Sequence, residues 1–267
     1  MMRHFASPCL AVLCFSLQAC ATPYIDLTQR VAALLPTDAI LLGEQHDAPD
    51  HQGLQRAVVL ELAGRQQLAA LALEMAEQGR STQGLARDAT QGAVKAALHW
   101  SDAGWPWADY GPVVMAAVRH GVPVLGANLA RDAMRAAMAN ESLDRHLQPA
   151  GLEQQRDNIR TGHCMMLPEG RITPMTRIQI ARDAAMANTA AAAVQAGKTV
   201  LLVAGGGHVR RGLGVPTHLP ATLRTSVVLA VAGPADQAMR SSADMVWQTP
   251  ALPRKDYCAG LGQRINR

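Results

Sequence analysis

Short apolar runs recur along this chain, and each ends in a turn that contains glycine or polar residues. Five of them have the length of a strand; they span residues 39–42, 68–73, 121–128, 199–204 and 226–232. Runs that are apolar throughout, rather than alternating, are typical of strands buried on both faces of a sheet. Segments with helical spacing separate them. The sequence therefore predicts an α/β fold, with a mainly parallel sheet of about five or more strands and helices on both faces.

Three other segments have weaker patterns. Residues 78–97 are polar and Ala-rich and are expected to form a helix, whereas residues 149–174 are expected to be irregular. Together with the residues before them, the latter predict a helical insertion at about 129–175. The tail, which includes Trp247, shows little pattern. Because no repeat or linker interrupts the chain, a single domain is expected over residues 20–267.

The first twenty residues have the pattern of a targeting segment. Arg3 precedes an apolar stretch that ends in Leu17-Gln18-Ala19-Cys20. This pattern predicts a signal peptide over residues 1–19, cleavage before Cys20 and lipidation of that cysteine. Gln18 fits the lipidation pattern less well than a small residue, so an ordinary secretory signal and a soluble periplasmic protein remain an alternative. In an oxidising compartment Cys164 and Cys258 either pair or remain free thiols.

The charge balance and the missing motifs exclude several functions. The formal net charge is +4, and the Lys and Arg residues are scattered. No basic run is interleaved with aromatics, which argues against nucleic acid as a partner. The chain also lacks the Gly-x-Ser-x-Gly elbow of serine hydrolases and a phosphate-binding loop.

Polar side chains follow four of the five apolar runs. Glu44 and His46 follow the first run, Glu74 the second, Asn128 the third and His208 the fourth. Each has an ordinary explanation as a cap or turn residue. Because ligands of parallel sheets bind outside the carboxyl ends of the strands, the four together favour one shared site.

Two of these ends share the pattern Gly-x-x-His, at Gly43–His46 and Gly205–His208. Two imidazoles with one or two carboxylates suit a divalent metal such as Zn, Mn or Fe that keeps a position open for water. In such a site His46 and His208 would be metal ligands. Glu44 or Glu74 would complete the metal shell or act as the catalytic general base of a hydrolase.

The ordered motifs resemble the ChaN-type haem-binding lipoproteins, whose superfamily also includes the Tiki proteins and, more distantly, the erythromycin esterases. The resemblance runs from about Ile40 to Leu219, and it is carried by residues 41–47, 73–75, 105–107, 110–112, 127–129, 162–164, 179–187, 204–208 and 214–216. It implies an outer-membrane-associated lipoprotein that holds haem, as a cofacial pair across a dimer with a tyrosine ligand. For the Tiki branch it implies metal binding through the Gly-x-x-His motifs.

The resemblance also suggests which residues contact haem. Tyr110 is the tyrosine within the matched region and would be the axial ligand, with Trp105 and Trp107 packed against the porphyrin. His163 lies in a segment that could supply the ligand instead. Arginines could pair with the haem propionates; the candidates are Arg131, Arg160 and Arg182.

Taken together, the sequence predicts a haem-binding, outer-membrane-anchored lipoprotein that faces the periplasm and serves haem or iron uptake. Its expected partners are haem, the membrane, an uptake receptor or transporter and a second copy in a homodimer. A binding protein is favoured over an enzyme. The alternatives are a metal-dependent hydrolase of the Tiki or erythromycin-esterase type and an accessory lipoprotein whose polar strand ends are vestigial.

Overall fold

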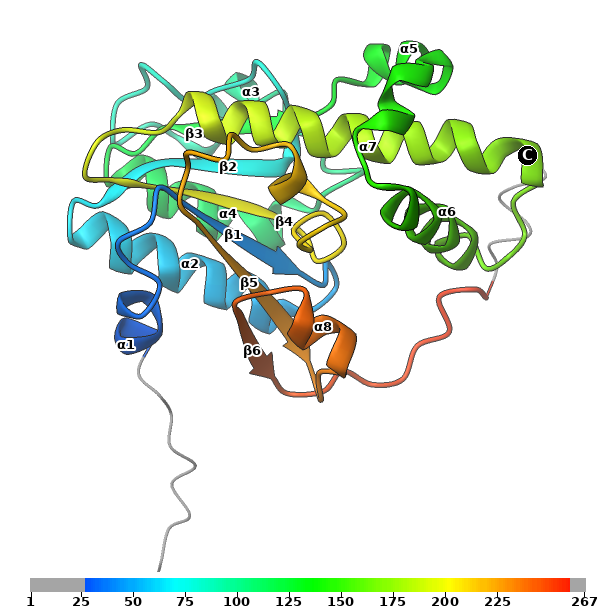
Figure 1. The fold of residues 1–267 in the computed structure, drawn as a ribbon. Helices are drawn as coiled ribbons and strands as arrows, with labels where there is room; N and C mark the ends of the chain where they lie inside the picture. Colours follow the sequence, from blue (N-terminus) through cyan, green and yellow to red (C-terminus); the bar gives the residue numbers. More distant parts are fainter. Residues whose placement is uncertain (1–26, 260–267) are drawn as a thin grey trace, which may run out of the picture.

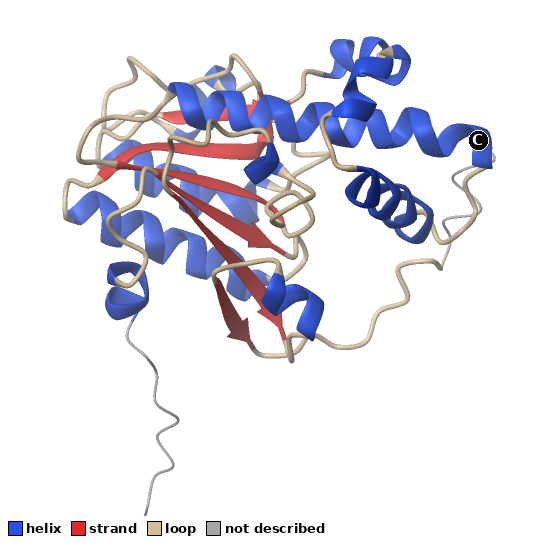
Figure 2. Cartoon of the chain, in the orientation of Figure 1, coloured by secondary structure: helices blue, strands red, loops and turns tan. Residues whose placement is uncertain are grey.

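One six-stranded sheet organises the molecule, and every pairing in it is parallel. The computed structural model describes residues 27–259. The strand order is β3-β2-β4-β1-β5-β6 (Figures 1 and 2). The strands are β1 (Ala39–Glu44), β2 (Leu68–Glu77), β3 (Val124–Asn128), β4 (Thr199–Gly205), β5 (Thr225–Ala232) and β6 (Met245–Thr249). The predicted α/β fold with a mainly parallel sheet is confirmed. The predicted signal peptide and Cys20 lie outside the described residues.

Helices cover both faces of the sheet (Figure 1). They are α1 (Leu27–Ala32), α2 (Pro49–Gly64), α3 (Gln91–Ala97), α4 (Trp107–Arg119), α5 (Met134–Ala139), α6 (Pro149–Gly162), α7 (Glu169–Ala192) and α8 (Gln237–Ser241). The helices α2 and α4 pack on one face, and α7 packs on the other. No helix within residues 27–259 has both the length and the apolar character needed to cross a bilayer.

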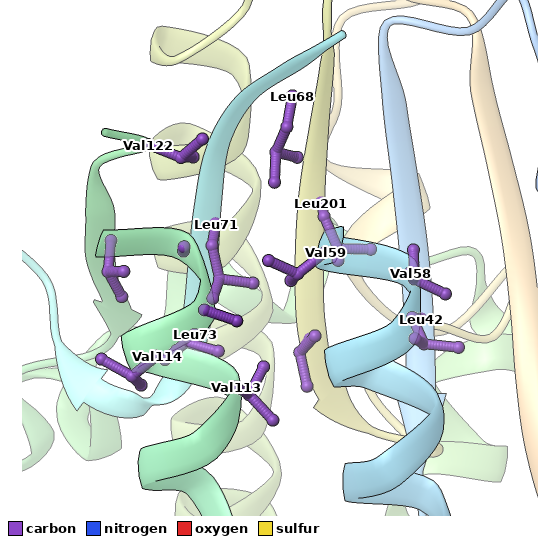
Figure 3. Packing of buried hydrophobic residues seen from close by; sticks show 14 of the residues in the cluster. Leu42, Val58, Val59, Leu68, Leu71, Leu73, Val113, Val114, Val122 and Leu201 are labelled. Atoms are coloured by element: carbon purple, nitrogen blue, oxygen red, sulfur yellow. The ribbon is translucent and has the colours of Figure 1, made fainter. Parts of the chain in front are cut away.

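The central strand β1 shows why its run is apolar throughout. Ile40 and Leu42 belong to the apolar cluster on the face that α2 and α4 cover. Figure 3 shows Leu42 close to Val58 of α2. The alternate residues of β1 face α7, and all six residues of the strand are buried. Each Leu, Ile or Val buried in this way stabilises the fold by about 1.5–3 kcal/mol.

The secondary structure differs from the sequence patterns in three places. In residues 78–97 only α3 is helical, because Gly79 and Gly84 adopt positive φ and break the chain into turns. Residues 149–174 are mostly helical, as a helical insertion requires, rather than irregular: α6 begins at Pro149, and α7 begins directly after Pro168. The tail contributes β6, in which Trp247 is buried.

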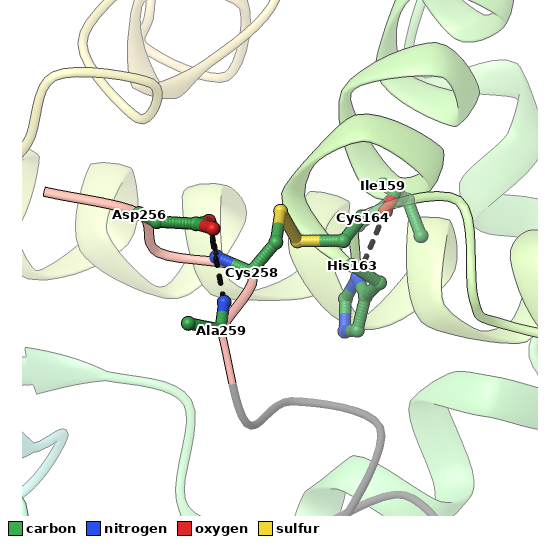
Figure 4. Close-up of a disulfide and its surroundings, with 6 residues drawn as sticks. All are labelled: Ile159, His163, Cys164, Asp256, Cys258 and Ala259. Carbon is green, nitrogen blue, oxygen red and sulfur yellow. Dashed lines mark hydrogen bonds between the residues drawn. A yellow bond between two sulfur atoms is a disulfide. The ribbon is translucent and has the colours of Figure 1, made fainter.

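The predicted insertion forms a small helical lobe, defined here as α5, α6 and the first half of α7. Its own apolar cluster consists of Ala137, Leu143, Leu147, Ile178 and Ile180. Figure 1 shows the lobe extending beyond the carboxyl ends of the strands. Cys164, in the turn between α6 and α7, forms a disulfide with Cys258 of the tail (Figure 4). The two cysteines are therefore paired rather than free.

Candidate functional site

The carboxyl ends of β1, β2 and β4, here called the rim, bring together four of the five predicted strand-end residues: Glu44, His46, Glu74 and His208. The fifth, Asn128, ends β3 and does not join this group of contacts. His46 Nδ1 lies 2.8 Å from Glu44 Oε1, and His46 Nε2 lies 4.0 Å from Glu74 Oε2. Glu74 Oε1 lies 3.4 Å from His208 Nε2 on the other side. The shared site expected from the apolar runs therefore exists, with Glu74 between the two imidazoles.

The first glycine of each Gly-x-x-His turn is required by close packing. A Cβ at Gly43 would lie 2.4 Å from Val209 Cγ2, and one at Gly205 would lie 2.8 Å from His46 Nε2. Gly205 also donates its backbone N–H to Glu74 Oε2 at 2.7 Å. The turns thus let the backbone reach the carboxylates and leave room for the imidazole.

Glu44 is a buried carboxylate surrounded by donors from two helices. Its Oε1 accepts a hydrogen bond from the Tyr110 hydroxyl at 2.6 Å and one from His46 Nδ1. Its Oε2 accepts from Gln52 Nε2 at 3.2 Å and from Gln55 Nε2. Four donors compensate the loss of hydration that burial of a charge imposes. The bond to Glu44 orients the His46 ring, whose Nε2 lies on the side of Glu74.

A second chain of contacts runs through His208. Its Nδ1 lies 2.5 Å from Asp183 Oδ1 on α7, and Gln179, one helical turn earlier, also contacts the imidazole. Burial alone would lower the pKa of His208, but the carboxylates of Glu74 and Asp183 outweigh it and raise that pKa to about 10. Burial would likewise raise the pKa of Glu74, but the charge of His208 lowers it to about 2. At neutral pH the rim holds an imidazolium between two acidic side chains.

This network does not support the predicted divalent metal site. Among residues 27–259 no group of three or more His, Cys, Asp or Glu side chains is arranged to hold a metal ion. Both nitrogens of His208 already face carboxylates, and His46 Nδ1 is bonded to Glu44. The expectation of Zn, Mn or Fe at His46, His208, Glu44 and Glu74 is therefore unsupported. The metal-dependent hydrolase built on it gains no support either.

The aromatic cluster consists of Trp100, Trp105, Trp107 and Tyr110, and its rings pack against one another and against His46. Trp105 stacks edge-on against His46, with ring centroids 4.8 Å apart, and against Tyr110 at 5.8 Å. Trp107 packs against Trp100. Tyr110 is 2% exposed, and burial together with the charge of Glu44 raises the pKa of its phenol. Haem ligation by Tyr110 stays a prediction. It would require the hydrogen bond between the Tyr110 hydroxyl and Glu44 to break.

The remaining predicted haem contacts do not gather at the rim network. His163 ends α6 and bonds through Nδ1 to the Ile159 carbonyl. Arg131 follows β3, Arg182 precedes Asp183 on α7, and Arg160 pairs with acidic side chains of the lobe. Their roles toward haem stay predictions.

A cleft of about 850 Å³ opens at the rim. We call it the rim cleft; its lining comprises residues 44–47, Gln179, residues 205–208, Lys255 and Tyr257. The last two come from the tail. Lys255 Nζ lies 3.1 Å from Asp47 Oδ2, and the Tyr257 hydroxyl lies 3.0 Å from the same oxygen.

Several residues of this site were not predicted from the sequence. Gln179 and Asp183 are four residues apart in an Ala-rich helix, and Gln52 and Gln55 are three apart in α2. In each case the sequence shows a polar pair on one helical face. Nothing in the sequence places that face at the rim. Tyr257 gave no signal, because it lies outside the segment that carried the resemblance.

Most of the chain matches a known protein family. Residues 30–219 match the model of a family described as "Haem-binding uptake, Tiki superfamily, ChaN". The chain belongs to this family. The resemblance inferred from the motifs is thereby confirmed. Residues 30–219 of this ChaN-family chain include the whole rim, whereas Lys255 and Tyr257 of the rim cleft lie beyond the match. No protein with curated annotation matches the chain.

Two solved structures resemble this ChaN-family member. The structure described as "Cofacial heme binding to ChaN of Campylobacter jejuni" shares 26% sequence identity with a TM-score of 0.67, and the match covers 82% of this chain and 89% of that chain. The type III effector HopBA1 shares 18% identity with a TM-score of 0.51, and the match covers 86% and 96% of the two chains. The second likeness indicates a shared fold only.

Proposed function

We propose that this chain binds haem in the rim cleft. Membership of a haem-binding uptake family carries the proposal. The Campylobacter jejuni ChaN structure, whose description records cofacial haem, supports it at 26% identity over most of both chains. The proposal concerns a binding function and needs no reaction at the rim.

The residues of the rim cleft fit a haem group. The volume of about 850 Å³ lies within the range of about 300–1,000 Å³ that is usual for small-molecule sites. The His46 side chain is 41% exposed and Tyr257 is 56% exposed, and both side-chain types ligate haem iron in proteins. Lys255 supplies a cation of the kind that pairs with a propionate. When bound, haem would supply the redox-active iron, and these residues would hold and orient it.

Absorbance titration of the purified protein with haemin tests the proposal. We expect a saturable shift of the Soret band, and we expect the band to change in His46→Ala or Tyr257→Phe. The variant Tyr110→Phe serves as the comparison. No shift in the wild-type protein would overturn the proposal. A band altered only by Tyr110→Phe would instead place the ligand at the buried tyrosine.

We propose further that haem binding serves haem or iron uptake by an outer-membrane lipoprotein that faces the periplasm. The support is the sequence of residues 1–20 and the uptake function in the description of the family. In this proposal the protein passes its cargo to an uptake receptor or transporter and acts as a homodimer.

The anchor can be tested apart from haem. We expect the wild-type protein to incorporate labelled fatty acid and to fractionate with membranes, because Cys20 carries acyl chains. The variant Cys20→Ser should lose both properties. A wild-type protein found without label in the soluble periplasmic fraction would favour an ordinary secretory signal.

A further inference from the structure

The segment Lys255–Cys258, here called the C-terminal strap, connects two distant parts of the molecule. After β6 the tail runs to the free end of the helical lobe (Figure 1). There Cys258 is bonded to Cys164, which is 94 residues earlier in the chain (Figure 4). The strap therefore lies between the lobe and the rim, where its residues form the outer part of the rim cleft.

Polar contacts hold the strap at the rim. Asp47 Oδ2 accepts hydrogen bonds from Lys255 Nζ and from the Tyr257 hydroxyl. Gln45 Nε2 donates a hydrogen bond to the Tyr257 oxygen at 3.1 Å. These side chains are exposed, and exposed contacts of this kind contribute about 0–1 kcal/mol each. Ordering each residue of the tail costs about 1–2 kcal/mol of backbone entropy. The covalent bond at Cys258 is thus the attachment that keeps the strap in place.

The disulfide also gathers exposed apolar side chains. Within residues 27–259 the large apolar side chains that are exposed are Met165 (71%), Met166 (39%) and Tyr257 (56%). Met165 and Met166 follow Cys164 directly, and Tyr257 directly precedes Cys258. Apolar side chains concentrated at one point of the surface mark a binding surface more often than scattered ones do.

We infer that the C-terminal strap is the retaining wall of the ligand site and that the Cys164–Cys258 bond controls how fast the ligand leaves. The inference rests on the proposed haem-binding function. The ligand class is a planar apolar ring system with carboxylate groups. Tyr257 faces its apolar edge, Lys255 faces a carboxylate, and His46 lies on the inner side of the cleft.

The test compares release of haem from strap variants. Haem-loaded protein is mixed with excess apo-globin, and the transfer rate is followed by absorbance. We expect the double variant Cys164→Ser/Cys258→Ser to release haem at least about tenfold faster than the oxidised wild type, since changes in a binding site act mainly on dissociation. The variant Lys255→Ala/Tyr257→Phe, which keeps the bond, should fall between them. Lys198→Ala, in an exposed turn away from the cleft, is the matched control and should release haem at the wild-type rate.

Limited trypsin digestion of the haem-free protein gives a readout that does not depend on the ligand. Cleavage at Arg254 and Lys255 should be slow in the oxidised wild type and fast in the cysteine double variant. Equal cleavage of both, or equal haem release from both, would overturn the inference while the haem-binding function stands. Absence of any Soret shift in the wild type would overturn both.

Discussion

Among single residues, Glu44 determines how the rim is built. It is the last residue of β1, it is buried, and donors from α2, α4 and the following turn all converge on it. A carboxylate placed there organises Tyr110, His46 and two glutamines around one charge. The four rim residues were predictable because each follows an apolar run directly. Their partners were not, because nothing local in the sequence relates α4 or α7 to the end of β1.

Replacing Glu44 by Gln should destabilise the protein. The amide would present N–H groups to donors that now meet a carboxylate, and each lost charge-assisted hydrogen bond costs about 1.5–3 kcal/mol. We expect the free energy of unfolding in urea to fall by at least about 3 kcal/mol. Glu61→Gln is the control, since Glu61 pairs with Arg65 near the surface, and it should cost less than about 1 kcal/mol. A loss of equal size in both variants would contradict this reading of Glu44.

The protonation of His208 should appear in the pH dependence of stability. Its pKa rises from 6.5 in the unfolded chain to about 10 in the folded protein, so the folded state binds this proton more tightly. The resulting stabilisation is complete below pH 6.5 and is lost as the pH rises toward 10. Between pH 7 and 10 we expect the free energy of unfolding to fall by up to about 1.4 kcal/mol per pH unit. The variant His208→Gln should lack this slope. If the free energy of unfolding in urea fell equally with pH in both proteins, the assignment would be contradicted.

Among the elements, α7 serves two structures at once. Its second half lies on the sheet and supplies Asp183 to the rim, whereas Ile178 and Ile180 belong to the core of the helical lobe. The strands were predicted well because a parallel sheet buried on both faces leaves continuous apolar runs. The lobe was predicted only in outline, since α6 buries just Gln155 and Ile159 and therefore carries a weak apolar pattern.

The turn after β4 provides a matched pair of glycine substitutions. A Cβ at Gly205 would press on His46, whereas a Cβ at Gly207 would have no atom within 4 Å. We expect Gly205→Ala to cost about 1–3 kcal/mol of unfolding free energy, the range typical of overpacking, and to shift the NMR titration of His46. Gly207→Ala should leave both unchanged. If both variants behave like the wild type, the close approach of Gly205 to His46 does not constrain the rim.

At the scale of the whole molecule, the lobe and the sheet differ in how much they bury. The helix α2 buries six side chains against the sheet, and α6 buries two. Opening of the lobe should therefore cost less free energy than opening of the body. A disulfide ties the lobe to the tail, and its pairing could not be predicted from the spacing of Cys164 and Cys258 alone.

Hydrogen exchange measured by mass spectrometry can test this difference. We expect amides of α6 to exchange at least about 100-fold faster than those of α2, because local opening of the lobe leaves the sheet intact. Reduction of the disulfide should raise exchange in α6 further and leave α2 unchanged. Equal protection of the two helices would show that lobe and body open as one unit.

The strand order has a consequence for biosynthesis. β1 is made first among the strands but lies at the centre of the sheet, between β4 and β5. Thr199, where β4 begins, is 155 residues beyond Glu44. At about 5–20 residues per second, roughly 10–30 s pass before the ribosome supplies the first neighbour of β1. Until then Ile40 and Leu42 form an unpaired apolar segment, so a fragment that ends before Thr199 should aggregate rather than fold.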